Sequence, residues 1–406
     1  MTRARWKQAA TALLFAAASA TCLPASPVEA APPSVVYFAG FGYAGDFDSI
    51  NSRFHYTTQL VPAHRTGDGT GPSEAENKLL EGVRLLKPAN LTLMAGSLAP
   101  GDRAILLVMV QTGETVSTEL IGNLYKLYIN LRAEALFFDY KSMTILRAYP
   151  LSAVYLDALP QKPTDAGIRT AVQRLLYTDK DSLVARFLQR VERAEPPGLP
   201  ARCFGVSDVK ISPEAAAWIP AYLRGNNVAE TWIADKLTEY LSDRTRAYVL
   251  PFAKGYVTGN VMPARMADGT AYNLTVPTPA YPITLEPQAL KKLPYDVKTG
   301  LGSSYIYASI IHLLIEEPRL PKRYLDARLL NGEAKVVPGN EPPADWPAFE
   351  ASTFELFRKL SLAIHGSEGL SGPERREIEK WINDQDNPRE LRRQLQATRE
   401  VIEQCK

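Results

Sequence analysis

Apolar and polar residues follow two different periods along the chain, and these periods predict strands and helices. Residues 104–110 form a continuous apolar run, which is typical of a buried strand. In residues 126–138 apolar side chains occupy every second position, and a turn at 139–142 leads into a partner strand at 143–151, so a long antiparallel hairpin is expected. Helical spacing predicts one helix capped by Ser73 and Glu76, and two more around residues 168–176 and 184–191.

The second half of the chain repeats that order of elements. Residues 204–210 and 247–252 have strand patterns, and Asn227 with Glu230 predicts the start of a helix between them. Residues 304–316 and 323–337 are further predicted strands, the latter folding back at Asn331-Gly332, a dipeptide typical of a type I′ turn. A helix with Phe354 and Ile364 on its apolar face is expected to end at Gly366. The expected fold class is therefore α/β (α+β), with two similar modules of mixed sheet and helices packed on one face.

The segment 195–200 contains three prolines and marks the expected boundary between modules. This gives a leader at 1–30, a first module at 31–198, a second module at 199–368 and a charged tail at 369–406. The tail is expected to form two helices, each with a proline near its start, that pack on the body as a hairpin or dock onto a partner.

Residues 255–300 have no counterpart in the first half and are interpreted as an insertion. Long excursions from a compact scaffold often carry binding surfaces, so Tyr256, Tyr272 and Tyr281 are the candidate binding surface. The alternative is a structural flap that covers a sheet edge. The segment 276–282 holds three prolines, which favour extended backbone.

At the level of element order, both halves resemble the amino-terminal module of the periplasmic translocation protein TolB and related modules in outer-membrane lipoproteins of the curli-secretion type. The resemblance rests on residues 104–151 and 228–337 and on no individual side chain. It implies assembly and protein contact in the cell envelope, and hence binding rather than catalysis.

The first thirty residues have the pattern of a secretory signal peptide. Arg3, Arg5 and Lys7 precede an apolar run at 9–20, and small residues follow up to a cleavage site near Ala30. The run is shorter than the ~20 residues that span a bilayer. Cys22 could carry a lipid in a lipoprotein, but Thr21 precedes it where Gly, Ala or Ser is usual. We therefore expect a periplasmic or secreted protein, peripheral to a membrane at most.

Removal of this leader changes the charge of the chain. The 46 basic and 44 acidic residues include Arg3, Arg5, Lys7 and Glu29 of the leader, which leaves 43 of each. A formally neutral chain gives no support for nucleic-acid binding, which requires a concentrated basic face. The expected partner is an envelope protein or a small ligand.

Two of the three cysteines, Cys203 and Cys405, remain after cleavage. An even pair in an oxidising compartment indicates a disulfide, and the alternative is two unrelated thiols. A bridge closing a loop of this length would stabilise the chain by roughly 5 kcal/mol.

Motifs for catalysis or cofactor binding are weak. Residues 40–45 match G-x-G-x-x-G, but acids and no apolar helical face follow, so a glycine-rich strand end is the favoured interpretation and no cofactor is expected. His55, His64, His312 and His365 show no metal-ligand spacing, and His312 is interpreted as a hydrogen-bonded side chain of an apolar strand. The sequence also lacks the full G-x-S-x-G nucleophile pattern. The sequence therefore predicts an exported, non-catalytic binding protein; the alternative is a secreted hydrolase with a site in the cleft between modules.

Overall fold

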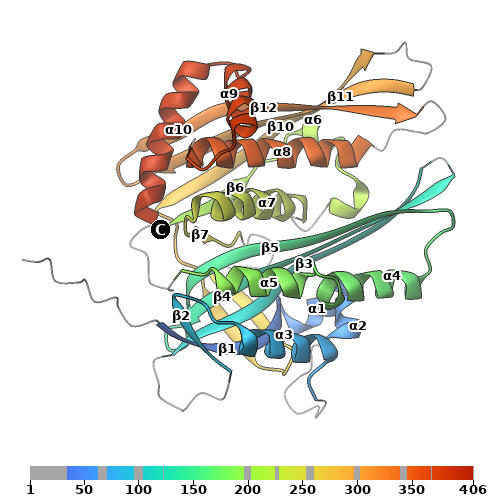
Figure 1. Cartoon of the computed structure of the whole chain (residues 1–406), viewed down its shortest axis with the longest axis vertical. Helices are drawn as coiled ribbons and strands as arrows, with labels where there is room; N and C mark the ends of the chain where they lie inside the picture. Colours follow the sequence, from blue (N-terminus) through green and yellow to red (C-terminus); the bar gives the residue numbers. More distant parts are fainter. Residues whose placement is uncertain are drawn as a thin grey trace, which may run out of the picture. The chain divides into compact units, whose positions relative to one another are not determined.

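The computed structural model describes residues 34–62, 71–95, 104–121, 123–195, 203–224, 228–252, 260–296, 302–338, 345–366 and 368–405. The predicted leader, the proline segment 196–200, Asn227 and Tyr256 lie outside these residues. Two mixed sheets with helices account for most of the described chain, which confirms the α/β class (Figure 1).

The first sheet contains the predicted long hairpin. Its strand order is β2-β1-β3-β4-β5-β9-β8, where β1 is parallel to β2 and β3, and the β3-β4-β5 strands are antiparallel. These five strands span Ser34–Ala44 (β1), Leu91–Met94 (β2), Ile105–Ile121 (β3), Leu124–Asp139 (β4) and Thr144–Leu159 (β5). The helices of this region are Phe47–Arg53 (α1), Thr57–Leu60 (α2), Glu74–Leu85 (α3), Asp165–Gln173 (α4), the π-helical turn Arg174–Thr178 (η1) and Leu183–Glu192 (α5). The predicted capping box of Ser73 and Glu76 is present at the start of α3.

Two strands from the predicted insertion also join this first sheet. β8 (Val261–Met266) and β9 (Ala271–Thr275) form a hairpin, in which β8 pairs with β1 and β9 with β5. The approach of β8 to β1 requires glycine at position 42, because a Cβ there would lie 2.7 Å from the sulfur of Met266 and 3.0 Å from the carbonyl oxygen of Arg265. Residues 261–275 therefore lie on an edge of the sheet, as the flap alternative expected. The insertion predicted at 255–300 is wrong for Tyr281–Asp296 (β10), because these residues form a central strand of the second sheet that corresponds to β3 of the first.

The second sheet repeats the first five strands in order and direction. Its order is β7-β6-β10-β11-β12, with β6 parallel to β7 and β10, and the remaining pairs antiparallel. The strands span Phe204–Val209 (β6), Val249–Leu250 (β7), Tyr281–Asp296 (β10), Gly302–Glu317 (β11) and Lys322–Pro338 (β12).

The turn predicted at Asn331-Gly332 is wrong, because β12 runs straight through these residues. They pair with Ser309 and Ala308 of β11. The Asn331 side chain donates to the carbonyl oxygen of Ser352 at 3.1 Å, so contacts with a neighbouring helix hold this residue in the strand against its local turn preference.

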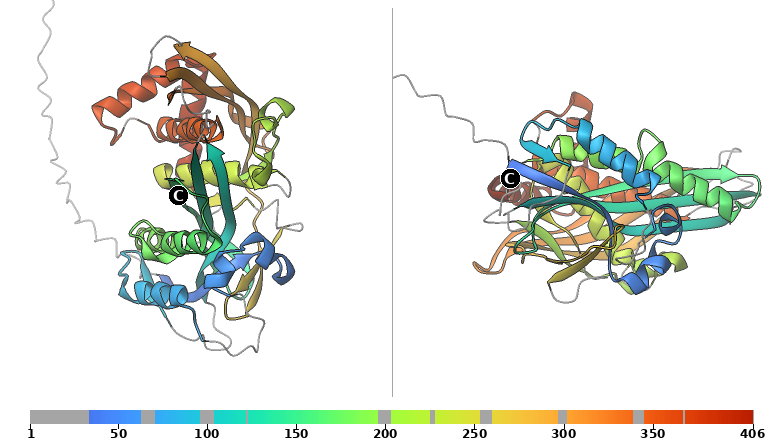
Figure 2. Two further views of the ribbon diagram at one scale, coloured as in Figure 1. Left: turned by 90° about the vertical axis from the view of Figure 1, so that its right-hand side faces the viewer. Right: turned by 90° about the horizontal axis from the view of Figure 1, so that it is seen from below.

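Before its tail, the second half contains the helices Pro213–Ala216 (α6), Ala221–Leu223 (η2), Val228–Thr245 (α7) and Asp345–His365 (α8). The two long helices α7 and α8 lie between the two sheets (Figure 1). α7 and α8 contact the second sheet, and α7 also contacts β5 of the first (Figures 1 and 2). The second sheet thus has helices on one face, as expected. The first sheet has α3 to α5 on one face and α7 on the other.

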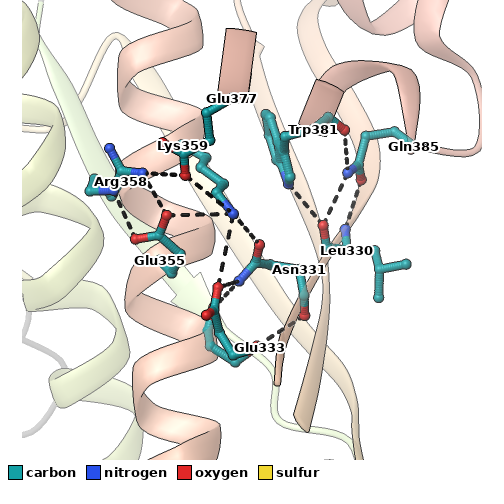
Figure 3. Close-up of polar contacts among 10 residues, drawn as sticks. Leu330, Asn331, Glu333, Glu355, Arg358, Lys359, Glu377, Trp381 and Gln385 are labelled. Carbon is teal, nitrogen blue, oxygen red and sulfur yellow. Dashed lines mark hydrogen bonds and ion pairs between the residues drawn. The ribbon is translucent and has the colours of Figure 1, made fainter. Parts of the chain in front are cut away.

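The charged tail forms the expected hairpin on the body, through Gly372–Asn383 (α9), Pro388–Ile402 (α10) and Glu403–Cys405 (η3). Figure 3 shows how α9 is attached: the indole N–H of Trp381 and the amide of Gln385 both donate to the carbonyl oxygen of Leu330 in β12. Beside them, Lys359 of α8 donates to the amide oxygen of Asn331 at 2.9 Å. No helix within the described ranges is long and apolar enough to cross a membrane.

Candidate functional site

The polar face of β4 is buried against α7. In a half-exposed strand this face would lie in water. Arg132 of β4 donates to the carboxylate of Asp235 in α7 at 3.0 Å, and both side chains are less than a tenth exposed. Gly113 of β3 makes room for the guanidinium, since a Cβ there would lie 2.3 Å from it. The alternating pattern thus supplies both an apolar core on one face and a layer of charges on the other.

A second set of contacts extends this layer along β5. Lys236 lies 2.8 Å from the carboxylate of Glu239 and donates a short hydrogen bond to the hydroxyl of Ser152. Ser152 in turn donates to Glu239 at 2.8 Å. We call Arg132, Glu134, Ser152, Asp235, Lys236 and Glu239 the buried charge layer.

Two carboxyl groups of the layer have raised pKa values. Burial raises the pKa of Asp235 to about 6, although the Arg132 charge opposes this shift. Burial, followed by the charges of Asp235 and Glu239, raises the pKa of Glu134 well above its usual value, and one of its oxygens has no hydrogen-bond partner among the described residues. The surroundings of Glu134 therefore favour its neutral form.

A cavity of about 540 Å³ adjoins this layer, at the edge of β5 between α5 and α7. Residues 147–152 of β5 form one wall, and beyond Thr144 this edge of β5 has no partner strand among the described residues. Pro150 fits such an edge, because its missing N–H breaks no ladder hydrogen bond. The remaining walls come from α5, the residues that follow it, and the C-terminal end of α7. We call this the arginine-lined cavity.

Positive charge dominates its lining. Three carboxylates line it, Glu195, Glu239 and Asp243, against six arginines: Arg147, Arg186, Arg190, Arg193, Arg244 and Arg246. Glu239 is engaged by Lys236, and Asp243 forms an ion pair with Arg190, whose pKa is lowered by burial. Within the described ranges no carboxylate forms an ion pair with the other five arginines. Crowded like charges of this kind attract an anion.

Two buried polar groups in the cavity have no partner. The Nε–H of Arg147, on a residue only 5 % exposed, has no acceptor, and the hydroxyl of Ser242, on a residue 2 % exposed, makes no hydrogen bond in the described structure. The Arg147 guanidinium lies over the rings of Tyr149 and Tyr248, 5.3 and 5.8 Å from their centroids, and donates to the carbonyl oxygen of Arg246 at 3.3 Å. A fixed guanidinium with an unused donor is suited to bind an oxyanion.

The predicted disulfide is wrong. No bridge joins Cys203 to Cys405, and both side chains are buried. Cys203 packs with Tyr248 and Leu250, whereas Cys405 belongs to the core of the second half. Burial raises the pKa of the Cys203 thiol to about 11. An even number of cysteines does not determine whether the two sulfurs meet.

The structure describes two of the three predicted tyrosines, and neither is exposed. Tyr281 is fully buried, since it lies in the central strand β10 against Phe204. Tyr272 is half-buried, with its ring centroid 5.2 Å from that of Phe138. Tyr256 is outside the described residues.

Other motifs have structural roles where they are described. The glycines at 40–45 allow β1 to reach β8, and Gly40 and Gly45 have positive φ angles of 98° and 112°. His312 contacts Glu286 at 3.1 Å and Asp326 at 2.8 Å, which confirms a hydrogen-bonded side chain. No three His, Cys, Asp or Glu side chains in the described ranges are grouped so that they could hold a metal ion.

The pattern analysis missed the arginines of the cavity. Arg186, Arg190 and Arg193 recur at helical spacing on the polar side of α5, a signal that usually marks a solvated helix face. Only the fold brings β5 and the end of α7 beside them. No protein-family model and no curated protein matches this chain.

Proposed function

We propose that this is an exported protein that acts by binding an anionic ligand in the arginine-lined cavity. The observation that carries the proposal is the ring of six arginines around the cavity, five of which form no ion pair with a carboxylate among the described residues, together with the unpartnered Arg147 Nε–H and Ser242 Oγ beside it. A buried donor without an acceptor is costly, by about 1–3 kcal/mol. Both atoms are covered by neighbouring side chains, so an oxyanion in the cavity would supply the acceptor after a small side-chain movement. The predicted signal peptide at 1–30 and the resemblance to envelope modules support a role outside the cytoplasm.

The test is direct binding of simple anions to the purified protein. Titration calorimetry with inorganic phosphate and with pyrophosphate, at low and high salt, should give saturable binding that weakens as salt rises. A ligand present at 100 times its Kd should raise the free energy of unfolding by about 2.7 kcal/mol.

Two variants and a control locate the site. Arg193→Met removes an exposed arginine of the cavity with no loss of buried contacts, and Ser242→Ala removes the unpartnered hydroxyl; both should weaken binding. Arg169→Met alters an exposed arginine of α4, away from the cavity, and should leave binding unchanged. Absence of binding by the unaltered protein, or equal affinity in all three variants, would overturn the proposal.

A hydrolase remains the second candidate, and one observation favours it. Ser152 and Lys236, which resemble the pair of a Ser-Lys hydrolase, meet beside the cavity. However, a catalytic lysine must lose its proton, and the carboxylate of Glu239 at 2.8 Å stabilises the charged ammonium. We therefore expect a fluorophosphonate probe to leave Ser152 unlabelled. Labelling that Ser152→Ala abolishes would favour the hydrolase.

A further inference from the structure

A second cavity adjoins the first at the C-terminal end of α7. Its volume is about 330 Å³, and it shares Asp243, Arg244 and Arg246 with the arginine-lined cavity. The rest of its lining comes from Thr245 and from the end of α8 and the residues after it: Leu362, His365, Glu368, Gly369 and Leu370. A ligand longer than one anionic group could therefore extend from one cavity into the other.

Arg246 stands at the junction of the two cavities in a strained conformation. Its φ angle is 59°, in the left-handed region, and it directly follows the last residue of α7, where glycine is usual. The side chain is exposed, and it makes no ion pair or hydrogen bond with the residues that the structure describes. A strained backbone that keeps an unpaired arginine where glycine would fit better points to a role for the side chain.

The same residue is joined to the unpartnered donor of the first cavity, because its carbonyl oxygen accepts a hydrogen bond from Arg147. Arg147 on one side of this bond faces the first cavity only, whereas the Arg246 side chain faces both. The bond thus fixes the backbone of Arg246 beside the Arg147 guanidinium, at the junction of the two cavities.

On the basis of the proposed function, we infer that the ligand carries at least two phosphate groups, one bound at Arg147 and the next at Arg246. The planar guanidinium group of an arginine can donate to two oxygens of one phosphate, and several neighbouring arginines favour a ligand with several anionic groups. The edge of β5 argues against an acidic peptide added as a strand, because Pro150 cannot donate to such a strand and is typical of edges that resist pairing. At the junction, Asp243 is paired with Arg190, and no ion pair joins it to Arg246 among the described residues.

The experiment compares anions of increasing length on the full chain. Tripolyphosphate should bind at least about tenfold more tightly than inorganic phosphate, and citrate, which offers carboxylates of similar charge, should bind more weakly than tripolyphosphate. Arg246→Gly should reduce this preference to about threefold or less and leave the melting temperature of the unliganded protein equal or higher, because glycine relieves the left-handed strain. Arg169→Met should keep the full preference.

The outcomes separate the two proposals. If no anion binds, the proposed function fails. The proposed function stands and the inference fails if phosphate binds but tripolyphosphate binds no more tightly than phosphate. The same holds if Arg246→Gly keeps the preference for tripolyphosphate. Citrate binding as tightly as tripolyphosphate also overturns the inference. Phosphatidylcholine vesicles with and without phosphatidic acid distinguish the two sources of the phosphate groups. If the protein sediments with the acidic vesicles and tripolyphosphate reverses this, the ligand is a lipid headgroup. If the protein binds tripolyphosphate but does not sediment with the vesicles, the ligand is a soluble phosphate.

Discussion

Replacing Arg132 by methionine should destabilise the fold by an amount that depends on pH. The substitution keeps the length of the side chain but leaves Asp235 without its cationic partner in a site where both side chains are less than a tenth exposed. Breaking a buried pair in this way costs about 3–5 kcal/mol. The loss should therefore be a large part of the stability of the whole chain.

The sign of the pH effect follows from the pKa of Asp235. Its folded pKa of about 6 lies above its ordinary value of 3.8, so ionisation opposes folding. The stability that this group contributes is fully present below 3.8 and is lost as pH rises through about 6, by about 3 kcal/mol in total. Without Arg132, whose charge lowers this pKa, the folded pKa must rise further. Below pH 6 both proteins hold a neutral Asp235, and above it the variant loses additional stability.

Urea unfolding followed by circular dichroism at about pH 5 and about pH 8 measures this difference. We expect the loss in Arg132→Met to be larger at the higher pH. The double variant Arg132→Met with Asp235→Leu should recover much of the loss, since both charges are then absent. Arg174→Met is the matched control: its ion pair with Asp179 is exposed, and its loss should stay below about 1 kcal/mol. A loss of equal size at both pH values, or a double variant as unstable as the single one, would refute the reasoning.

Three further predictions concern single side chains. Glu134→Gln should stabilise the protein more at about pH 8 than at about pH 5, because the raised pKa of the buried carboxyl costs more stability as pH rises above the ordinary value; a loss at both pH values in urea unfolding would contradict the raised pKa. Lys359→Met should destabilise the attachment of α9, because it removes the ion pair with Glu377 of α9 at 3.6 Å, and limited proteolysis should then cut α9 and α10 first; an unchanged pattern would show that the apolar contacts suffice. Cys203 should react slowly with a maleimide in the native protein, because burial raises its thiol pKa to about 11, and fast labelling without denaturant would contradict the described burial.

Local patterns predicted most of the elements because each pattern reflects one buried face. The run at 104–110, the alternation at 126–138 and the cap at Ser73 all report short-range preferences, and all three appear as β3, β4 and α3. The repeat of strand order between the halves was also visible as a repeat of patterns. Whether it arose by duplication stays a prediction, because element order alone does not establish it.

Where patterns failed, long-range contacts decide the structure. Asn331-Gly332 has the composition of a turn but is held in β12 by β11 and α8, and Tyr281 was assigned to a surface although it occupies a central strand. The polar positions of β4 gave no sign that a helix from the second half would cover them. The site could not be predicted from the sequence for the same reason, because its arginines come from three segments that only the fold brings together.

The buried charge layer and the arginine-lined cavity lie along the same two elements, β5 and α7, and this proximity bears on function. An apolar contact between α7 and the first sheet would be as stable or more so, because buried charges must lose their hydration. The chain instead keeps Ser152 and Glu239 in both the layer and the lining of the cavity. Departures from the most stable arrangement tend to gather at functional sites. The polar interface therefore supports the cavity as the place where this protein acts, and the response of binding to changes in Glu239 would measure how closely the two are coupled.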